Sequence, residues 1–218
     1  MMRAEREVTL AKLLRVRAAD GGARLCLVVE LTDGEDTWRE TLTVFAARLD
    51  RVPATGELDT ETLALLRRED ALSTALAMGL RSLGAGGSSE QHLARKLRAK
   101  GVEGYVAREA VAELSSRGYL DETDAAVREA ERGLVKLWGD RRILTELRAK
   151  GYGDEALQAA RVRLRREDGV LRCRRLLQKK HVAVADDPVA AQKLIASLMR
   201  YGYTTAEIRT ALTAECEE

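Results

Sequence analysis

The string LRAKG occupies Leu97–Gly101 and returns at Leu147–Gly151, fifty residues further along the chain. The windows 95–114 and 145–164 around these copies share seven identities, and a weaker third copy, LMRYG, stands at Leu198–Gly202. In each copy, apolar residues at helical spacing lead up to a glycine, the residue that a left-handed cap at a helix end favours. The repeat therefore predicts a helical unit of about 50 residues that occurs three times.

Apolar residues at helical spacing also precede and follow each copy, so we expect three helices in each unit. Small units of this kind cover their apolar faces by stacking, which predicts an elongated array whose functional element is a long surface and not a pocket. Ser88 with Gln91, and Thr204 with Glu207, have the spacing of capping boxes, and Asp187-Pro188 is a further signal for a helix start.

The first fifty residues have a different pattern. Short runs rich in Val, Leu and Thr lie at 8–17, 23–31 and 37–45, and turn-forming residues separate them. We expect a small N-terminal β-hairpin or three-stranded antiparallel unit that packs on a neighbouring helix. The predicted fold class is thus mainly α, with three tandem three-helix repeats. The predicted domains are a strand-rich extension at 1–58 and helical repeats at 59–117, 118–167 and 168–218.

The composition excludes several classes of protein. Lys and Arg number 37 against 35 Asp and Glu, and a net charge of +2 cannot give the long-range basic field of a protein that coats nucleic acid. Cys26, Cys173 and Cys216 are widely spaced, which argues against a disulfide framework or a structural zinc site. No segment approaches the roughly 18 apolar residues of a membrane span. We therefore expect a cytoplasmic protein without metal, cofactor or membrane contact.

Motifs for catalysis are missing from the sequence. No G-x-S-x-G and no HExxH string occurs, and GAGGSS at 84–89 lacks the lysine of a phosphate-binding loop. His92 and His181 are far apart, and neither has a second metal-ligand type at helical spacing. Acidic pairs such as Asp121-Glu122 mark helix starts, where they offset the positive end of the dipole. We expect no enzyme activity.

Charge is distributed unevenly along the chain. Residues 1–70 carry a net charge of −3 and residues 71–218 carry +5, while the stretch 161–181 alone carries +7. This stretch is either a solvated helix pair or a contact for phosphates or an acidic protein surface. A smaller basic group lies at 141–150. The candidate partner-binding residues are Arg141, Arg142, Arg148, Lys150, Arg161, Arg163, Arg166, Arg172, Arg174, Arg175, Lys179 and Lys180.

Four aromatic residues, Trp138, Tyr152, Tyr201 and Tyr203, occupy repeat-related positions. We expect them to pack between helices and not to stack with bases.

Four segments together, in this order and spacing, resemble the RecX regulators of the RecA recombinase. They are SSEQHLARKLRAKG at 88–101, RGYLDETDAA at 117–126, WGDRRILTELRAKG at 138–151 and RYGYTTAEIRTAL at 200–212. The resemblance covers about residues 70–212, and more faintly the N-terminal part. It implies three tandem three-helix repeats, in agreement with the periodicity.

The resemblance further implies a regulatory protein in homologous recombination, DNA repair and the SOS response. Such a protein docks along the groove of RecA filaments on single-stranded DNA and mainly restrains ATP hydrolysis, filament growth and strand exchange. It acts by binding and catalyses no reaction. The candidate arginines and lysines come from charge clustering and not from the resemblance. We also expect weak DNA binding and a monomer.

Two alternatives stay open. The first is a helical-repeat protein that binds DNA directly, for which affinity would fall steeply with salt. The second is a general scaffold for protein interactions.

Overall fold

The computed structural model describes residues 7–84, 87–180 and 188–213. His181, Asp187 and Cys216 lie outside the described residues, as do parts of the predicted 1–58 and 168–218 domains and of the GAGGSS segment. The strands are β1 (Leu10–Ala19), β2 (Arg24–Thr32), β3 (Thr37–Phe45) and β4 (Gly56–Leu58). The helices are α1 (Thr60–Gly84), α2 (Glu90–Ala99), α3 (Gly104–Ser116), α4 (Glu122–Val135), α5 (Asp140–Ala149), α6 (Asp154–Leu164), α7 (Gly169–Lys179), α8 (Pro188–Arg200) and α9 (Thr205–Thr213).

This element order confirms a mainly helical chain with a strand-rich N-terminal part. Among the described residues, three helices fall within each of the ranges 59–117, 118–167 and 168–218. The chain divides into two compact units. The N-terminal unit comprises Met1–Arg81 with Lys96–Glu113, and the C-terminal unit comprises Ser82–Arg95 with Leu114–Glu218.

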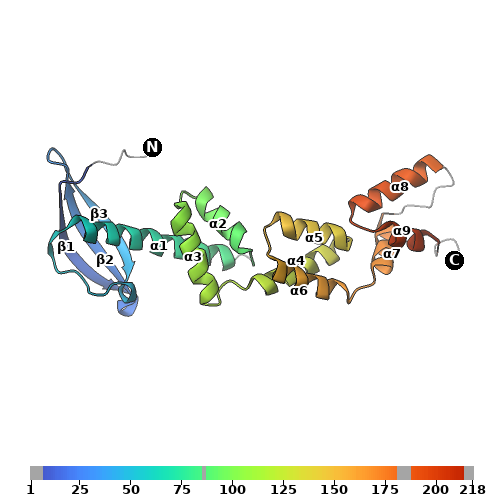
Figure 1. The fold of residues 1–218 in the computed structure, drawn as a ribbon, viewed down its shortest axis with the longest axis horizontal. Coiled ribbons are helices and arrows are strands. Elements are labelled where there is room, and N and C mark those ends of the chain that lie inside the picture. Colours follow the sequence, from blue (N-terminus) through green and yellow to red (C-terminus); the bar gives the residue numbers. More distant parts are fainter. Residues whose placement is uncertain (1–6, 85–86, 181–187, 214–218) are drawn as a thin grey trace. The chain divides into compact units, whose positions relative to one another are not determined.

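In the N-terminal unit, the strands form one antiparallel sheet in the order β3-β2-β1-β4. The short β4 pairs with β1 at Ala11–Leu13. The sequence did not predict this strand, because three residues are too few to show an alternating pattern. Alternate residues of β2 from Leu25 to Leu31 are buried, and they share one core with Leu63 and Leu66 of α1. Figure 1 shows α1 lying across the sheet, which agrees with the predicted packing of the strands on a helix.

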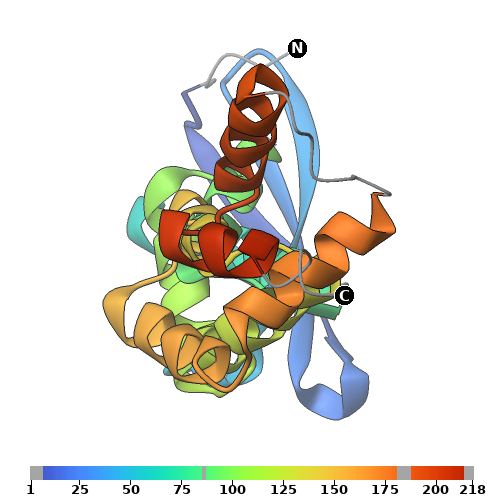
Figure 2. The same cartoon turned by 90° about the vertical axis from the view of Figure 1, so that its right-hand side faces the viewer.

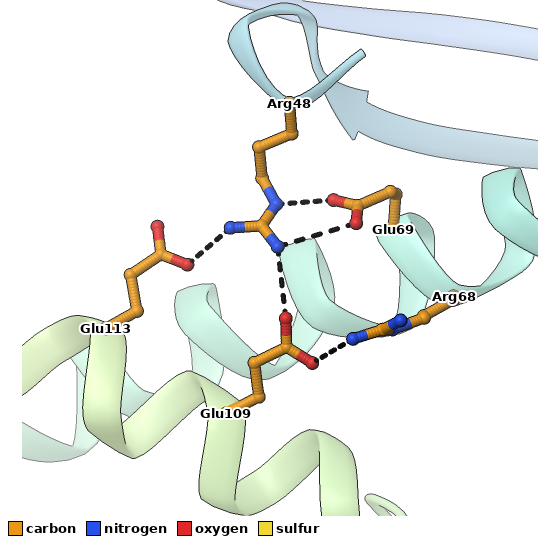
Figure 3. A network of polar contacts seen from close by, with 5 residues as sticks. All are labelled: Arg48, Arg68, Glu69, Glu109 and Glu113. Carbon is orange, nitrogen blue, oxygen red and sulfur yellow. Dashed lines mark hydrogen bonds and ion pairs between the residues drawn. The ribbon is translucent and has the colours of Figure 1, made fainter. Parts of the chain in front are cut away.

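A network of charged side chains also joins the elements of the N-terminal unit (Figure 3). Arg48 leaves the turn η2 (Ala46–Arg48) after β3, and its guanidinium donates to Glu69 of α1 and, at 3.1 Å and 2.8 Å, to Glu109 and Glu113 of α3. Arg68 donates to Glu109 at 2.9 Å. The hydrogen bond to Glu69 is the main cause of the raised pKa of Arg48. The network therefore links the sheet to α1 and α3.

The glycines that end the three repeated strings all have left-handed backbones. The φ angles are 89° at Gly101, 81° at Gly151 and 96° at Gly202. After each glycine, the next N–H donates to the carbonyl five residues earlier, at 3.1 to 3.3 Å, which is the hydrogen bond of a Schellman cap. The predicted caps are confirmed.

One of the two described capping boxes differs from its prediction. At α9, the Thr204 N–H donates to the Glu207 carboxylate at 2.7 Å and the Glu207 N–H donates to the Thr204 hydroxyl at 3.2 Å, as predicted. At α2, the predicted pair of Ser88 and Gln91 is wrong. Ser89 is the capping residue, since its hydroxyl accepts from the His92 N–H at 3.1 Å and the helix starts one residue later than expected.

Within the C-terminal unit, successive repeats are joined by the same kind of hydrogen-bonded contact. The start of the middle helix of one repeat rests on the glycine cap of the following middle helix. At α2, the Ser89 hydroxyl donates to the Lys150 carbonyl at 2.6 Å. At α5, the Gly139 N–H donates to the Tyr201 carbonyl at 2.8 Å. Further along, α7 packs on α9, and α8 also contacts α9 (Figures 1 and 2).

Candidate partner-binding surface

Some of the candidate basic residues have internal acidic partners. In α6, Arg163 binds Glu131 of α4 at 3.0 Å and Glu167 at 3.2 Å, and the hydrogen bond to Glu131 is the main cause of its raised pKa. Arg172 of α7 forms an ion pair with Asp140, the first residue of α5. These pairs join helices of the C-terminal unit to one another.

Arg172 has the surroundings of a structural residue. It is 5% exposed, and its guanidinium carbon lies 6.0 Å from the centre of the Tyr203 ring. The Tyr203 hydroxyl donates to the Leu137 carbonyl at 2.8 Å, and burial raises the pKa of Tyr203 to about 12. In the described part of the chain, Arg172 Nε and Nη1 and Arg174 Nε are buried without a hydrogen-bond partner.

The other candidate residues differ in their interaction partners and in their exposure to solvent. Lys150 forms an ion pair with Glu129, and Arg161 donates to Gln158 at 3.3 Å. The Arg142 side chain is half-buried. The exposed candidates are Arg141, Arg148, Arg166, Arg175, Lys179 and Lys180.

A groove of about 530 Å³ lies beside the paired arginines. We call it the α4–α7 groove, and its lining includes Leu134, Val135, Arg163, Glu167, Leu171 and Arg175. Val135 is 80% exposed and Leu171 is 49% exposed. Exposed aliphatic side chains beside arginine are typical of surfaces that bind protein partners.

A second group combines cations with aromatic rings, and we call it the cation–aromatic cluster. Its members are Lys136, Trp138, Arg142, Lys180 and Tyr201. The guanidinium carbon of Arg142 lies 4.2 Å from the centre of the Trp138 ring and 5.6 Å from that of Tyr201. Lys136 Nζ lies 4.8 Å from the Trp138 centre, and Lys180 Nζ lies 4.2 Å from the Tyr201 centre.

Comparisons with known proteins give a match of fold. No protein-family model and no curated protein matches the sequence. A crystal structure of the regulatory protein RecX matches with a TM-score of 0.71 at 18% identity, over 92% of this chain and 98% of that one. The chain has the RecX fold. RecX from Lactobacillus salivarius also matches, with a TM-score of 0.54 at 19% identity, over 66% of this chain and 96% of that one.

On this RecX fold, all four aromatic residues pack against a helical core, as predicted, but only two of them are buried. Tyr152 and Tyr203 are buried in the cores of the second and third repeats. Trp138 and Tyr201 are half-exposed and have cations over their rings.

Val135 and Leu171 line the groove, but the charge pattern of the sequence did not predict them as surface residues of the site. Leu171 precedes the buried residues Arg172 and Cys173 of α7, so its position off the apolar face is the signal that could have identified it.

Of the helices in the described ranges, none has both the length and the apolar character that crossing a membrane requires. Across the same ranges, no group of three or more His, Cys, Asp or Glu side chains is arranged to hold a metal ion. Cys26 and Cys173 form no disulfide in this part of the chain.

Proposed function

We propose that this chain regulates RecA by binding RecA and its filaments on single-stranded DNA, and that it mainly restrains ATP hydrolysis, filament growth and strand exchange. The observation that carries the proposal is the RecX fold, which extends over 92% of the chain. On this proposal the chain acts in the cytoplasm as a monomer, in recombination and DNA repair. It works by binding and catalyses no reaction.

The α4–α7 groove is the contact that we propose for RecA. Its exposed aliphatic residues, Val135 and Leu171, can bury apolar area against a partner, and that burial favours association. Arg175 lies at the same groove, and no ion-pair partner is found for it among the described residues. It can therefore form a bidentate pair with a carboxylate of the partner. Exposed Arg166 adds charge to the basic stretch.

The test is a titration of the protein into cognate RecA filaments on single-stranded DNA, with ATP hydrolysis as the readout. We expect inhibition by the wild-type protein, and loss of inhibition in Val135→Glu and in Arg166→Glu/Arg175→Glu. Since these three side chains are exposed, the variants should keep the wild-type thermal unfolding.

Matched controls lie on the N-terminal unit. Val52→Glu changes another exposed valine, and Arg15→Glu/Arg17→Glu reverses two other exposed charges. Both should inhibit as the wild type does. Wild-type protein without effect on ATP hydrolysis or on strand exchange would reject the proposed function, and equal losses in the controls would reject the groove as the contact.

A further inference from the structure

The cation–aromatic cluster lies at the junction of the second and third repeats. Lys136 and Trp138 belong to the α4–α5 connection and Arg142 to α5, while Lys180 follows α7 and Tyr201 follows α8. All five residues belong to the C-terminal unit. Chain segments far apart in the sequence thus bring three cations to two aromatic rings.

None of these three cations has an ion-pair partner in the part of the chain that the structure describes. Lys136, Arg142 and Lys180 form no salt bridge there, unlike Arg163 and Arg172. The ring faces attract the cations but carry no net charge, so the positive charge of the cluster is not neutralised. A surface of this kind binds an anionic partner.

The repeat itself does not require this composition. In the shift of 50 that superimposes the LRAKG strings, Trp138 corresponds to Ser88 and Arg142 to His92, and in the next shift of 51 Tyr201 corresponds to Lys150. The first junction, between α2 and the cap of α5, therefore forms without tryptophan or tyrosine at these three positions. Trp138 and Tyr201 pack in part against the cores of the second and third repeats, but the exposed parts of their rings and the cations over them need another reason than packing of the repeat.

We propose that the cation–aromatic cluster binds single-stranded DNA. Lys136, Arg142 and Lys180 would contact phosphates, while the guanidinium plane of Arg142 and the exposed parts of the two rings offer flat surfaces to bases. Cationic side chains beside aromatic rings are the usual combination in proteins that bind single strands, because the phosphates are charged and every base has a flat face. A carboxylate-rich polypeptide needs the cations but gains nothing from the rings. Duplex DNA keeps its bases stacked inside and cannot use the rings either.

The experiment uses the fluorescence of Trp138. The chain has two tryptophans, so Trp38→Phe leaves Trp138 as the only one. We expect a thirty-residue oligo-dT to quench this fluorescence. With three phosphate contacts, the logarithm of the affinity should fall with the logarithm of the salt concentration with a slope of about −2. A duplex of equal length should bind more weakly.

Charge removal locates the site. Lys136→Gln/Arg142→Gln/Lys180→Gln should weaken binding of oligo-dT at low salt by about tenfold or more. Arg142 is half-buried, so Lys136→Gln/Lys180→Gln, which changes only exposed residues, should show the same direction with an unchanged fold. The control is Lys12→Gln/Arg15→Gln/Arg17→Gln, which removes the same charge from exposed positions of the N-terminal unit and should keep most of the affinity.

Three results would overturn the proposal. The first is an equal loss of oligo-dT affinity in the control variant, which would mean that the attraction is diffuse. The second is quenching by oligoglutamate but not by oligo-dT, which would mean an acidic protein partner. The third is no change in Trp138 fluorescence on addition of oligo-dT at low salt. The titration contains no RecA, so its result is independent of the proposed regulation of RecA.

Discussion

Replacement of Arg48 by methionine should selectively destabilise the N-terminal unit. Arg48 bonds three carboxylates, and Arg68 stays beside Glu109 when Arg48 is removed. Among the described residues, Arg48 is the ion-pair partner found for Glu69, and Arg68 acts on Glu69 only by charge attraction without an ion pair. Glu69 is 5% exposed, so Arg48→Met leaves a buried carboxylate without its cation.

The size of the effect follows from burial. Breaking a buried ion pair by removing one partner costs about 3–5 kcal/mol. The Arg48 side chain is 27% exposed, and water partly screens the network, so we expect a loss of about 2–3 kcal/mol in the free energy of unfolding. With an m-value of about 1–3 kcal/mol/M, the urea midpoint falls by roughly 0.7–3 M.

Unfolding is followed by the fluorescence of a tryptophan in the N-terminal unit. In a Trp138→Phe background, Trp38 on β3 is the remaining tryptophan and follows unfolding of the N-terminal unit in urea. Arg39→Met is the control, because Arg39 pairs with Glu30 at the surface and its side chain is 66% exposed. That control should cost less than about 1 kcal/mol.

A second variant separates a lost pair from lost packing. Arg48→Met/Glu69→Leu removes both charges and should recover most of the stability, because the buried carboxylate is no longer left unpaired. If Arg48→Met shifts the midpoint no more than Arg39→Met, or if the double variant is less stable than the single one, our account of the network is wrong.

Two other predictions concern the C-terminal unit. A Cβ at Gly139 would lie 2.3 Å from the Gly202 carbonyl carbon, so Gly139→Ala should lower thermal stability by about 2 kcal/mol or more in circular dichroism, whereas Gly84→Ala, with open space, should stay within about 1 kcal/mol of wild type. Equal melting of the two variants would contradict this. Burial raises the pKa of Tyr152 and Tyr203 from 10.0 to about 12. Between these pH values the native state keeps two protons that the unfolded state loses. The urea concentration at the unfolding midpoint should therefore decrease as the pH rises from 10 to about 12. A constant midpoint, with all tyrosinate absorbance appearing near pH 10, would refute it.

The repeated glycines could be predicted because their cause is local. A left-handed residue at a helix end is sterically favourable for glycine, and the same string marks it at Gly101, Gly151 and Gly202. The strand β4 could not be predicted in this way, since its three residues form a strand only through pairing with β1. The Ser88 box failed for a related reason: two adjacent serines can cap α2, and the junction with Lys150 uses Ser89.

The candidate surface was predictable in part, because a charge sum over one stretch omits partners from elsewhere in the chain. Arg163 pairs with Glu131, and Arg172 pairs with Asp140, in each case 32 residues away. Both carboxylates lie outside the stretch 161–181, whose net charge of +7 therefore overstates the charge available to a partner. Long-range pairing of this kind depends on how helices of successive repeats pack, which no local pattern specifies.

The two repeat junctions differ in the hydrogen bond that forms them, and the second junction brings the residues of the cation–aromatic cluster together. At the first junction, Ser89 caps α2 with its hydroxyl, and the same hydroxyl reaches the cap of α5. The equivalent residue at the second junction is Gly139, which has no side chain, and its backbone N–H bonds directly to the Tyr201 carbonyl. A Cβ has no room there, so this junction is a contact of backbone on backbone. Close approach holds Tyr201 near the start of α5, where Arg142 lies over its ring and over that of Trp138. Glycine at position 139 thus allows the close backbone contact that places Tyr201 beside Arg142.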